Sequence, residues 1–251
     1  MTQPNAAVAI VHARGPEESV LLIRRSERAD DSWSGHWSFP GGRCDAEDRD
    51  LLDTARRELA EECGVPLARE QMEAALPHRE ARRAAPPYVL VAPFVFGVSA
   101  PLPTVLEVRE ASAALWIPLR ELRDPSRHEL RPVPGRPPEV LFPCVPLEGT
   151  PLWGFTYRLI TDWLGLAAPE RSFEAANQVL EFLLSRGLTL RHGWENGKRL
   201  ARVSGEIPSA AVVEHFSGPS AYIPSLSSME VNTQSVRVLG ADLEEYLIRG
   251  D

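Results

Sequence analysis

Residues 39–65, which read FPGGRCDAEDRDLLDTARRELAEECGV, decide the fold of the N-terminal part of this chain. From Asp50 to Cys63 the apolar side chains recur at steps of three and four, which is typical of a helix with one buried face. These side chains are Leu52, Ala55, Leu59 and Cys63. Gly64 and Pro66 follow directly, and both residue types end helices. The sequence therefore predicts a Gly-Gly turn and a loop that lead into a helix over residues 50–63.

Three glutamates on this helix, Glu58, Glu61 and Glu62, stand at positions i, i+3 and i+4. This spacing places the three carboxylates on one helix face, where each like-charged pair costs roughly 0.2–0.5 kcal/mol. One adjacent cation, Arg57, does not neutralise three anions. A hard divalent cation such as Mg²⁺ would, because it prefers oxygen ligands. The alternative is a solvated acidic face, and the fixed residues around the glutamates favour the metal site.

The segment resembles the Nudix box, the loop-helix-loop metal site of the Nudix hydrolases. That box reads Gly-x5-Glu-x7-Arg-Glu-U-x-Glu-Glu-x-Gly-U, where U is apolar. This chain has Asp48 at the position of the first Glu, and eight residues rather than seven separate it from Arg57. Both departures are similar to the coenzyme A diphosphatase branch, and the resemblance covers about residues 5–166. That branch usually carries a basic residue just before the position of Gly35, where residues 30–34 of this chain read DDSWS.

The resemblance implies a role for each polar residue of the box. It implies that Glu58 and Glu62 are the principal ligands of Mg²⁺ or Mn²⁺. Glu61 and the backbone carbonyl of Gly41 would complete the metal site. Arg57 would hold a carboxylate in its ligating conformation, and a surface salt bridge with Glu61 is its alternative role.

Further candidates lie around the box. Asp48 is either an additional metal ligand or the N-cap of the helix, since Asp is favoured at that position. The candidate substrate-binding residues are Arg24, Arg25, Arg43 and Phe39. Because adjacent side chains of a strand alternate, one of the two neighbouring arginines should point away from the site. Glu107 and Glu110 are the candidate general bases.

The expected reaction is the metal-assisted hydrolysis of a pyrophosphate bond in a nucleoside diphosphate derivative. The resemblance implies coenzyme A or an acyl-CoA as substrate, with 3′,5′-ADP and a 4′-phosphopantetheine as products. ADP-ribose, NADH, a dinucleoside polyphosphate or a nucleoside triphosphate are alternatives, because the box handles only the diphosphate that they share. A non-catalytic Nudix regulator that senses a ligand is a further alternative. The complete set of carboxylates argues against it, as does the lack of a strongly basic helix in the last third of the chain.

Composition limits the partners of this 251-residue chain. With 27 Lys and Arg against 35 Asp and Glu, its net charge of −8 argues against nucleic acid as the main partner. Three cysteines favour a reducing compartment over a disulfide framework. The longest apolar stretch, residues 88–98, is short of the roughly 20 residues that span a bilayer. We expect a cytoplasmic protein that binds a small molecule and no membrane, with a second copy of the chain as a candidate partner.

The expected fold class is α+β in two domains. The resemblance implies a Nudix α/β/α sandwich with a mixed sheet over residues 1–166, and strands are predicted over 7–13, 20–25, 88–99 and 113–117. A second helix is predicted over 153–166. Residues 167–251 are predicted to form a small α+β extension of unknown role. Its expected elements are helices over 173–185 and 241–248 and strands near 188–191, 199–203 and 236–239.

Overall fold

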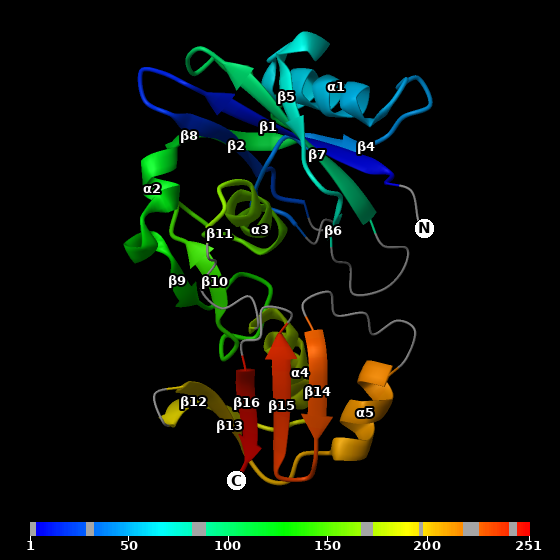
Figure 1. Cartoon of the computed structure of the whole chain (residues 1–251), viewed down its shortest axis with the longest axis vertical. Coiled ribbons are helices and arrows are strands. Elements are labelled where there is room, and N and C mark those ends of the chain that lie inside the picture. Colours follow the sequence, from blue (N-terminus) through cyan, green and yellow to red (C-terminus); the bar gives the residue numbers. More distant parts are fainter. Residues whose placement is uncertain are drawn as a thin grey trace. The chain divides into compact units, whose positions relative to one another are not determined.

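The computed structural model describes residues 4–28, 33–81, 89–166, 173–195, 198–217, 226–240 and 245–251 (Figure 1). The chain forms two compact units. The first unit comprises residues 1–128 and 144–166, and the second comprises residues 129–143 and 167–251. Each unit has a hydrophobic core of its own.

A mixed sheet forms the centre of the first unit. Its strands are β1 (Ala6–Ala13), β2 (Ser19–Arg25), β3 (Trp37–Ser38), β4 (Gly41–Arg43), β5 (Met72–Ala75), β6 (Arg79–Ala81), β7 (Val89–Val98) and β8 (Ala111–Pro118). The strand order is β3-β2-β1-β7-β5, while β8 pairs with β2, β4 with β1 and β6 with β7. β1 and β7 run parallel and the other pairs are antiparallel. The predicted mixed sheet is confirmed, although Tyr88, the predicted start of its third strand, lies outside the described residues.

Helices pack on both faces of this sheet. Alternation along β1 turns Ala7, Ala9 and Val11 towards the apolar stripe of α1 (Leu51–Cys63), and these residues share one core cluster. On the opposite face, Phe155 of α3 (Gly154–Trp163) packs against a cluster that includes Ala6 and Val91. This arrangement agrees with the expected α/β/α sandwich.

Both ends of α1 are fixed by local contacts. The Asp50 carboxylate accepts a hydrogen bond from the backbone N–H of Asp53, so Asp50 is the N-cap. At the other end Gly64 adopts a φ of 65°, and its N–H donates to the carbonyl of Ala60. A left-handed residue at this point is most easily supplied by glycine. The predicted helix and its glycine stop are confirmed.

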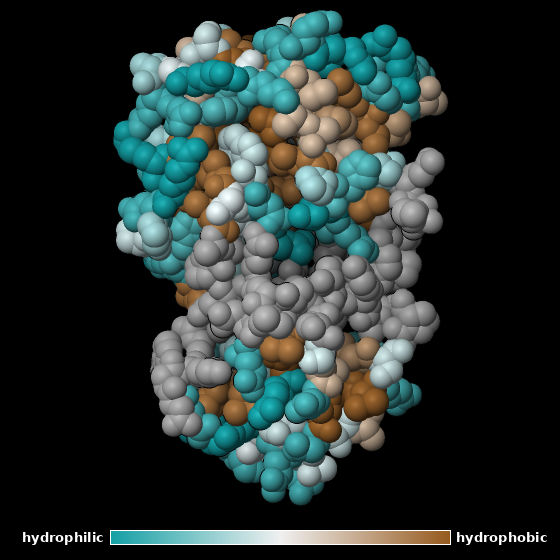
Figure 2. All heavy atoms as spheres, in the orientation of Figure 1, coloured by the Kyte–Doolittle hydropathy of each residue, from teal (hydrophilic) through white to brown (hydrophobic). Residues whose placement is uncertain are grey.

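Short elements complete the first unit. They are 3₁₀ helices over Arg69–Gln71 and Pro125–Arg127, helix α2 (Leu119–Arg123) and strand β11 (Leu152–Trp153). β11 pairs antiparallel with Cys144 and Val145 of β10 (Phe142–Val145), whose first two residues are assigned to the second unit. Figure 2 shows hydrophilic residues gathered over α1 and the loop that leads into it. Within the described ranges, no helix has the length and apolar character needed to cross a bilayer.

The second unit contains a five-stranded sheet with the order β12-β13-β16-β15-β14. Its elements are β9 (Glu129–Arg131), α4 (Phe173–Ser185), β12 (Leu190–Glu195), β13 (Lys198–Val203), α5 (Ser209–Ser217), β14 (Leu226–Val231), β15 (Ser235–Gly240) and β16 (Glu245–Gly250). The predicted α+β character and the helix over 173–185 are confirmed. The helix predicted over 241–248 is wrong where it is described, because residues 245–250 form a strand that buries Tyr246 and Ile248 on one face. Residues 241–244 lie outside the described ranges.

Candidate active site

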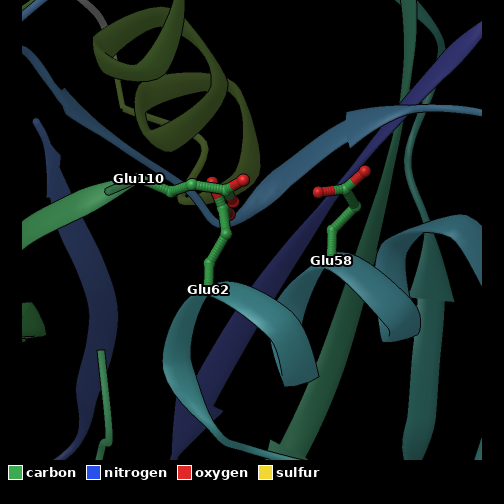
Figure 3. Close-up of side chains that lie close together, drawn as sticks. All are labelled: Glu58, Glu62 and Glu110. Atoms are coloured by element: carbon green, nitrogen blue, oxygen red, sulfur yellow. The ribbon is translucent and has the colours of Figure 1, made fainter. Parts of the chain in front are cut away.

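Three carboxylates meet beside the N-terminal sheet. One oxygen each from Glu58, Glu62 and Glu110 lies within 4.8 Å of the others. Glu58 and Glu62 come from successive turns of α1, and Glu110 comes from the segment just before β8 (Figure 3). We call these three residues the carboxylate cluster. The helix spacing predicted the first two members, while the third is brought in by the fold.

Backbone hydrogen bonds fix Glu110 in this position. The N–H of Glu107 donates to the carbonyl of Glu62 at 3.2 Å, which ties the segment before β8 to the end of α1. The N–H of Glu110 then donates to the carbonyl of Glu107 at 2.8 Å. From the other side, the N–H of Ser26 donates to the carbonyl of Glu110 at 2.9 Å. Glu110 is therefore held between α1 and the end of β2.

The two glycines of β4 make room for the helix carboxylates. The N–H of Gly41 donates to Oε2 of Glu62 at 2.8 Å, and a Cβ on Gly41 would lie 2.3 Å from the carbonyl oxygen of Ala7. A Cβ on Gly42 would lie 2.3 Å from Oε1 of Glu58. Neither position can carry a side chain without displacing its neighbours. The present position of the Glu58 carboxylate therefore depends on the missing Cβ of Gly42.

Burial raises the pKa of both helix carboxylates. Glu62 is 3% exposed, and its burial raises the pKa to about 8. The Gly41 N–H and the charge of Arg25 lower this pKa, whereas the charges of Glu58 and Glu110 raise it. Burial also raises the pKa of Glu58 above its usual value. A divalent cation fits this donor set, because its ligands are oxygens and its charge favours the ionised carboxylates.

Arg57 links the loop before α1 to the carboxylate cluster. Its Nε and Nη2 donate to the carboxylate of Asp48 at 3.0 and 3.1 Å. Its Nη1 donates to Oε1 of Glu58 and to Oε2 of Glu61, both at 3.0 Å. Its Nη2 also donates to the carbonyl of Arg43 at 3.0 Å. Arg57 therefore holds Glu58 from the side while standing outside the cluster.

Comparison with known proteins identifies the family of this site. Residues 3–136, just over half of the chain, match the family model described as NUDIX domain. The chain belongs to the Nudix family. An uncharacterised protein of Schizosaccharomyces pombe is 38% identical over 108 residues, which are 41% of this chain and 32% of that protein. The mitochondrial coenzyme A diphosphatase NUDT8 of Mus musculus is 38% identical over 74 residues, which are 28% of this chain and 35% of the relative.

The matched parts span about a third of the length of these curated relatives. Among solved structures, a MutT/nudix family protein from Enterococcus faecalis has a TM-score of 0.46 at 18% identity, covering 64% of this chain and 60% of that one. The NUDIX domain of Shewanella oneidensis NrtR, complexed with ADP ribose, has a TM-score of 0.40 at 22% identity. That match covers 49% of this chain and 77% of the NrtR chain.

Asp48 of the Nudix box has contacts that its sequence position did not predict. Its side chain is 5% exposed, and besides Arg57 it accepts hydrogen bonds from Thr54 Oγ1 at 2.8 Å and from the Asp45 N–H at 3.0 Å. The hydrogen bond from Arg57 is the main cause that lowers its pKa to about 2. The N-cap alternative for Asp48 is wrong, since Asp50 caps α1. Asp48 lies outside the carboxylate cluster and fixes Arg57 instead.

Glu61 and Glu107 also lie outside the carboxylate cluster. The side chain of Glu61 is 55% exposed and contacts Arg57. Glu107 is exposed, and its Oε1 accepts a hydrogen bond from the N–H of Arg109 at 3.2 Å. Of the two predicted bases, Glu110 is therefore the one within the cluster.

The predicted substrate-binding residues separate into two groups. Leu21 and Ile23 of β2 face α1. Arg25 follows a register shift in the pairing of β2 with β8, and its charge lowers the pKa of Glu62. Arg24 points away, and its Nε donates to the carbonyl of Gly35 at 3.2 Å. This outcome agrees with the expectation that one of the two arginines faces away from the site.

Arg43 and Phe39 differ in exposure. Arg43 is exposed at the end of β4, and its backbone carbonyl accepts a hydrogen bond from Arg57. Phe39 is 3% exposed, so its ring belongs to the core and offers no surface to a substrate. Sequence reasoning also missed Thr54, which lies one turn before Glu58 on α1 and holds Asp48 through its hydroxyl. The sequence did indicate this residue, because its spacing places it on the same helix face as the three glutamates.

Proposed function

We propose that this Nudix chain hydrolyses the pyrophosphate bond of a nucleoside diphosphate derivative. The observation that carries the proposal is the carboxylate cluster, in which Glu110 from a distant part of the sequence meets Glu58 and Glu62. Three carboxylates so close together repel one another, and a divalent cation would offset this repulsion. The family to which the chain belongs supports the same reaction class.

Glu58 and Glu62 would hold the cation, with Mg²⁺ or Mn²⁺ as the proposed metal. When bound there, the cation would offset the charge of the two phosphates and lower the pKa of a coordinated water. The Gly41 N–H orients Glu62, and Arg57 orients Glu58. These contacts fix the directions of both carboxylates before a substrate arrives, which favours catalysis by positioning.

Glu110 is our proposed general base. It belongs to a different element from the two helix glutamates and its carboxylate lies within 4.8 Å of theirs. A water that attacks one phosphorus atom must lose a proton, and a carboxylate at this distance can accept it directly or through one further water. The bond from that phosphorus to the bridging oxygen breaks, and the second phosphate leaves. Arg25, whose charge acts on Glu62, would contact the phosphate oxygens.

Coenzyme A or an acyl-CoA is the proposed substrate. Two observations support it: the spacing between Asp48 and Arg57 resembles the coenzyme A diphosphatase branch, and a relative that is 38% identical over 74 residues is a coenzyme A diphosphatase. The proposed products are 3′,5′-ADP and a 4′-phosphopantetheine.

A substrate panel tests this function. Coenzyme A, acetyl-CoA, ADP-ribose, NADH, a dinucleoside polyphosphate and a nucleoside triphosphate are each incubated with the protein and Mg²⁺, Mn²⁺ or EDTA, and the products are identified by mass spectrometry. We expect metal-dependent release of 3′,5′-ADP from coenzyme A. Preferred cleavage of another diphosphate would show that this compound, and not coenzyme A, is the substrate. Tight binding of a nucleotide with no turnover in any arm would identify a ligand-sensing protein and overturn the proposed reaction.

A further inference from the structure

The segment that carries Glu110 has little support from packing. Leu106 packs against the core shared by α1 and β1, and Ala111 belongs to that core, whereas residues 107–109 between them are exposed. Val108 is 78% exposed. Glu110 nevertheless points its carboxylate into the carboxylate cluster (Figure 3). Hydrogen bonds therefore have a large part in setting the position of this carboxylate.

Three successive backbone carbonyls of this segment accept hydrogen bonds from residues that directly follow β2. Oγ of Ser26 donates to the carbonyl of Val108 at 2.9 Å. Nη2 of Arg28 donates to the carbonyl of Arg109 at 2.6 Å, and the N–H of Ser26 donates to the carbonyl of Glu110. Two of the three donors are side chains, so substitution can remove them while the backbone stays unchanged.

The donors are themselves held in place. The N–H of Arg28 donates to Oγ of Ser34 at 2.8 Å. On the other side of the segment, the N–H of Glu107 donates to the carbonyl of Glu62. No other hydrogen bond to the carbonyls of residues 108 and 109 comes from the described part of the chain. The two side chains therefore complete the attachment of the segment on the side away from α1.

We propose that Ser26 and Arg28 are positioning residues for the Glu110 carboxylate. They hold the two peptide groups that lead into Glu110, and so keep its side chain turned into the carboxylate cluster. This inference rests on the proposed function, in which Glu110 accepts the proton of the attacking water. It adds two residues outside the Nudix box on which that proton transfer depends.

Four variants of these two residues and one control give the test. Ser26→Ala and Arg28→Met remove the donors, whereas Ser26→Thr keeps a hydroxyl and Arg28→Lys keeps a cationic donor. Because a displaced base slows only the chemical step, we expect kcat to fall about tenfold in Ser26→Ala and in Arg28→Met, with KM and the Mn²⁺ dissociation constant within about twofold of wild type. The conservative variants should keep kcat within about threefold.

Ser112→Ala is the matched control. Its Oγ also donates to a backbone carbonyl across β2 and β8, that of Arg24 at 3.2 Å, but it does not hold the segment before Glu110. Its kcat should therefore stay within about twofold of the wild-type value. A kcat that is unchanged in both Ser26→Ala and Arg28→Met would overturn the inference.

A double-mutant cycle shows whether Ser26 and Arg28 act through Glu110. Glu110→Gln already removes the base, so adding Ser26→Ala or Arg28→Met to it should cause no further loss of kcat. Equal losses of kcat in the wild-type and Glu110→Gln backgrounds would show a merely structural role and overturn the inference.

Hydrogen exchange provides a readout without turnover. The N–H groups of Glu110 and Ala111 both donate to the carbonyl of Glu107. Their exchange should become at least about threefold faster in Ser26→Ala and in Arg28→Met but not in Ser112→Ala, and unchanged exchange would contradict the proposal. If the wild-type protein hydrolyses no compound of the substrate panel, the proposed reaction fails, while faster exchange in the two variants would still support the holding of Glu110 by Ser26 and Arg28.

Discussion

Glu62 combines a buried position on α1 with an ionisable side chain. It belongs to the buried side of α1, yet it carries a carboxylate with a pKa raised to about 8 by burial. The Gly41 N–H is its direct partner, and one backbone hydrogen bond offsets only part of the cost of burying a charge. A side chain kept at such a cost is typical of a functional site.

The variant Glu110→Gln tests whether Glu110 acts as a general base or as a metal ligand. The amide keeps the size of the side chain and cannot accept the proton, so we expect kcat to fall by about 10²–10⁴-fold with little change in Mn²⁺ affinity. Glu107→Gln is the matched control, since Glu107 lies three residues away outside the carboxylate cluster, and its kcat should stay within about twofold. Steady-state kinetics and Mn²⁺ titration check both variants. Loss of Mn²⁺ affinity in Glu110→Gln would make Glu110 a ligand and refute its assignment as base.

Asp48→Asn tests the position of Arg57. The substitution removes the charge that two Arg57 nitrogens contact, and we expect a loss of stability of about 1–3 kcal/mol. Because Arg57 also holds Glu58, the dissociation constant for Mn²⁺ should rise about tenfold. Asp45→Asn is the control, because Asp45 is 62% exposed and lies 3.6 Å from Arg57. Reduced stability with unchanged Mn²⁺ affinity would show that Asp48 supports only the fold.

At the scale of elements, β4 lies so close to α1 that a side chain on Gly42 would reach the carboxylate of Glu58. In Gly42→Ala the new Cβ would collide with Oε1 of Glu58, so the carboxylate must turn away. We expect kcat to drop by at least about tenfold while the helix content stays unchanged. Gly193→Ala of β12 is the control, because its Cβ would lie 3.7 Å from Leu200, an ordinary contact. Circular dichroism and kinetics compare the variants, and an active Gly42→Ala protein would contradict the described approach.

The start of α1 makes the first unit sensitive to acid. Hydrogen bonds from Arg69 lower the pKa of Asp50, and those from Arg49 and then Arg69 lower the pKa of Asp53. A carboxyl group with a lowered folded-state pKa stabilises the protein above its unfolded value of about 3.9, and this stability is lost as the pH falls through the folded-state pKa. We therefore expect Tm to fall between pH 5 and pH 2.

Arg69→Gln should reduce that acid dependence, because it removes a partner of both carboxylates. Arg120→Gln serves as the control, since its ion pair with Glu17 lies outside this group. Calorimetric Tm values at several pH values decide the point. An equal fall of Tm with acid in wild type and Arg69→Gln would show that other groups cause it.

The sequence predicts elements with strong local signals better than it predicts contacts between distant segments. The apolar period and the glycine stop set the bounds of α1 because both act within one helix. Glu110 was one of two candidates, and only the hydrogen bonds from α1 and β2 decide between it and Glu107. In residues 245–248, Glu and Leu alternate with Tyr and Ile, and a short run of this kind fits a helix or a strand. Pairing with β13 and β15 makes it a strand.

At the scale of the whole molecule, the chain divides its roles between two units. Every residue that we propose for the reaction lies within residues 24–110 of the first unit. Residues 129–143 are assigned to the second unit although they precede the last helix of the first. The composition of residues 129–143 did not predict that they belong to the second unit. Their assignment depends on buried contacts, such as those of Val140 with the core of that unit.

The net charge of −8 affects how the whole molecule attracts an anionic substrate. An acidic molecule repels a free diphosphate compound, and a bound cation together with a few fixed arginines must supply the local attraction. The central claim is therefore that Glu58 and Glu62 of the carboxylate cluster bind a divalent cation, without which these carboxylates would repel the phosphates.

Titration of Mn²⁺ into the wild-type protein and into Glu62→Gln, followed by calorimetry, tests this claim most directly. Glu107→Gln provides the control with the same change of charge. We predict that wild type and Glu107→Gln bind Mn²⁺ with equal affinity, and that Glu62→Gln binds at least about tenfold more weakly. Equal Mn²⁺ affinity in Glu62→Gln and wild type, or no Mn²⁺ binding by the wild-type protein, would contradict the account.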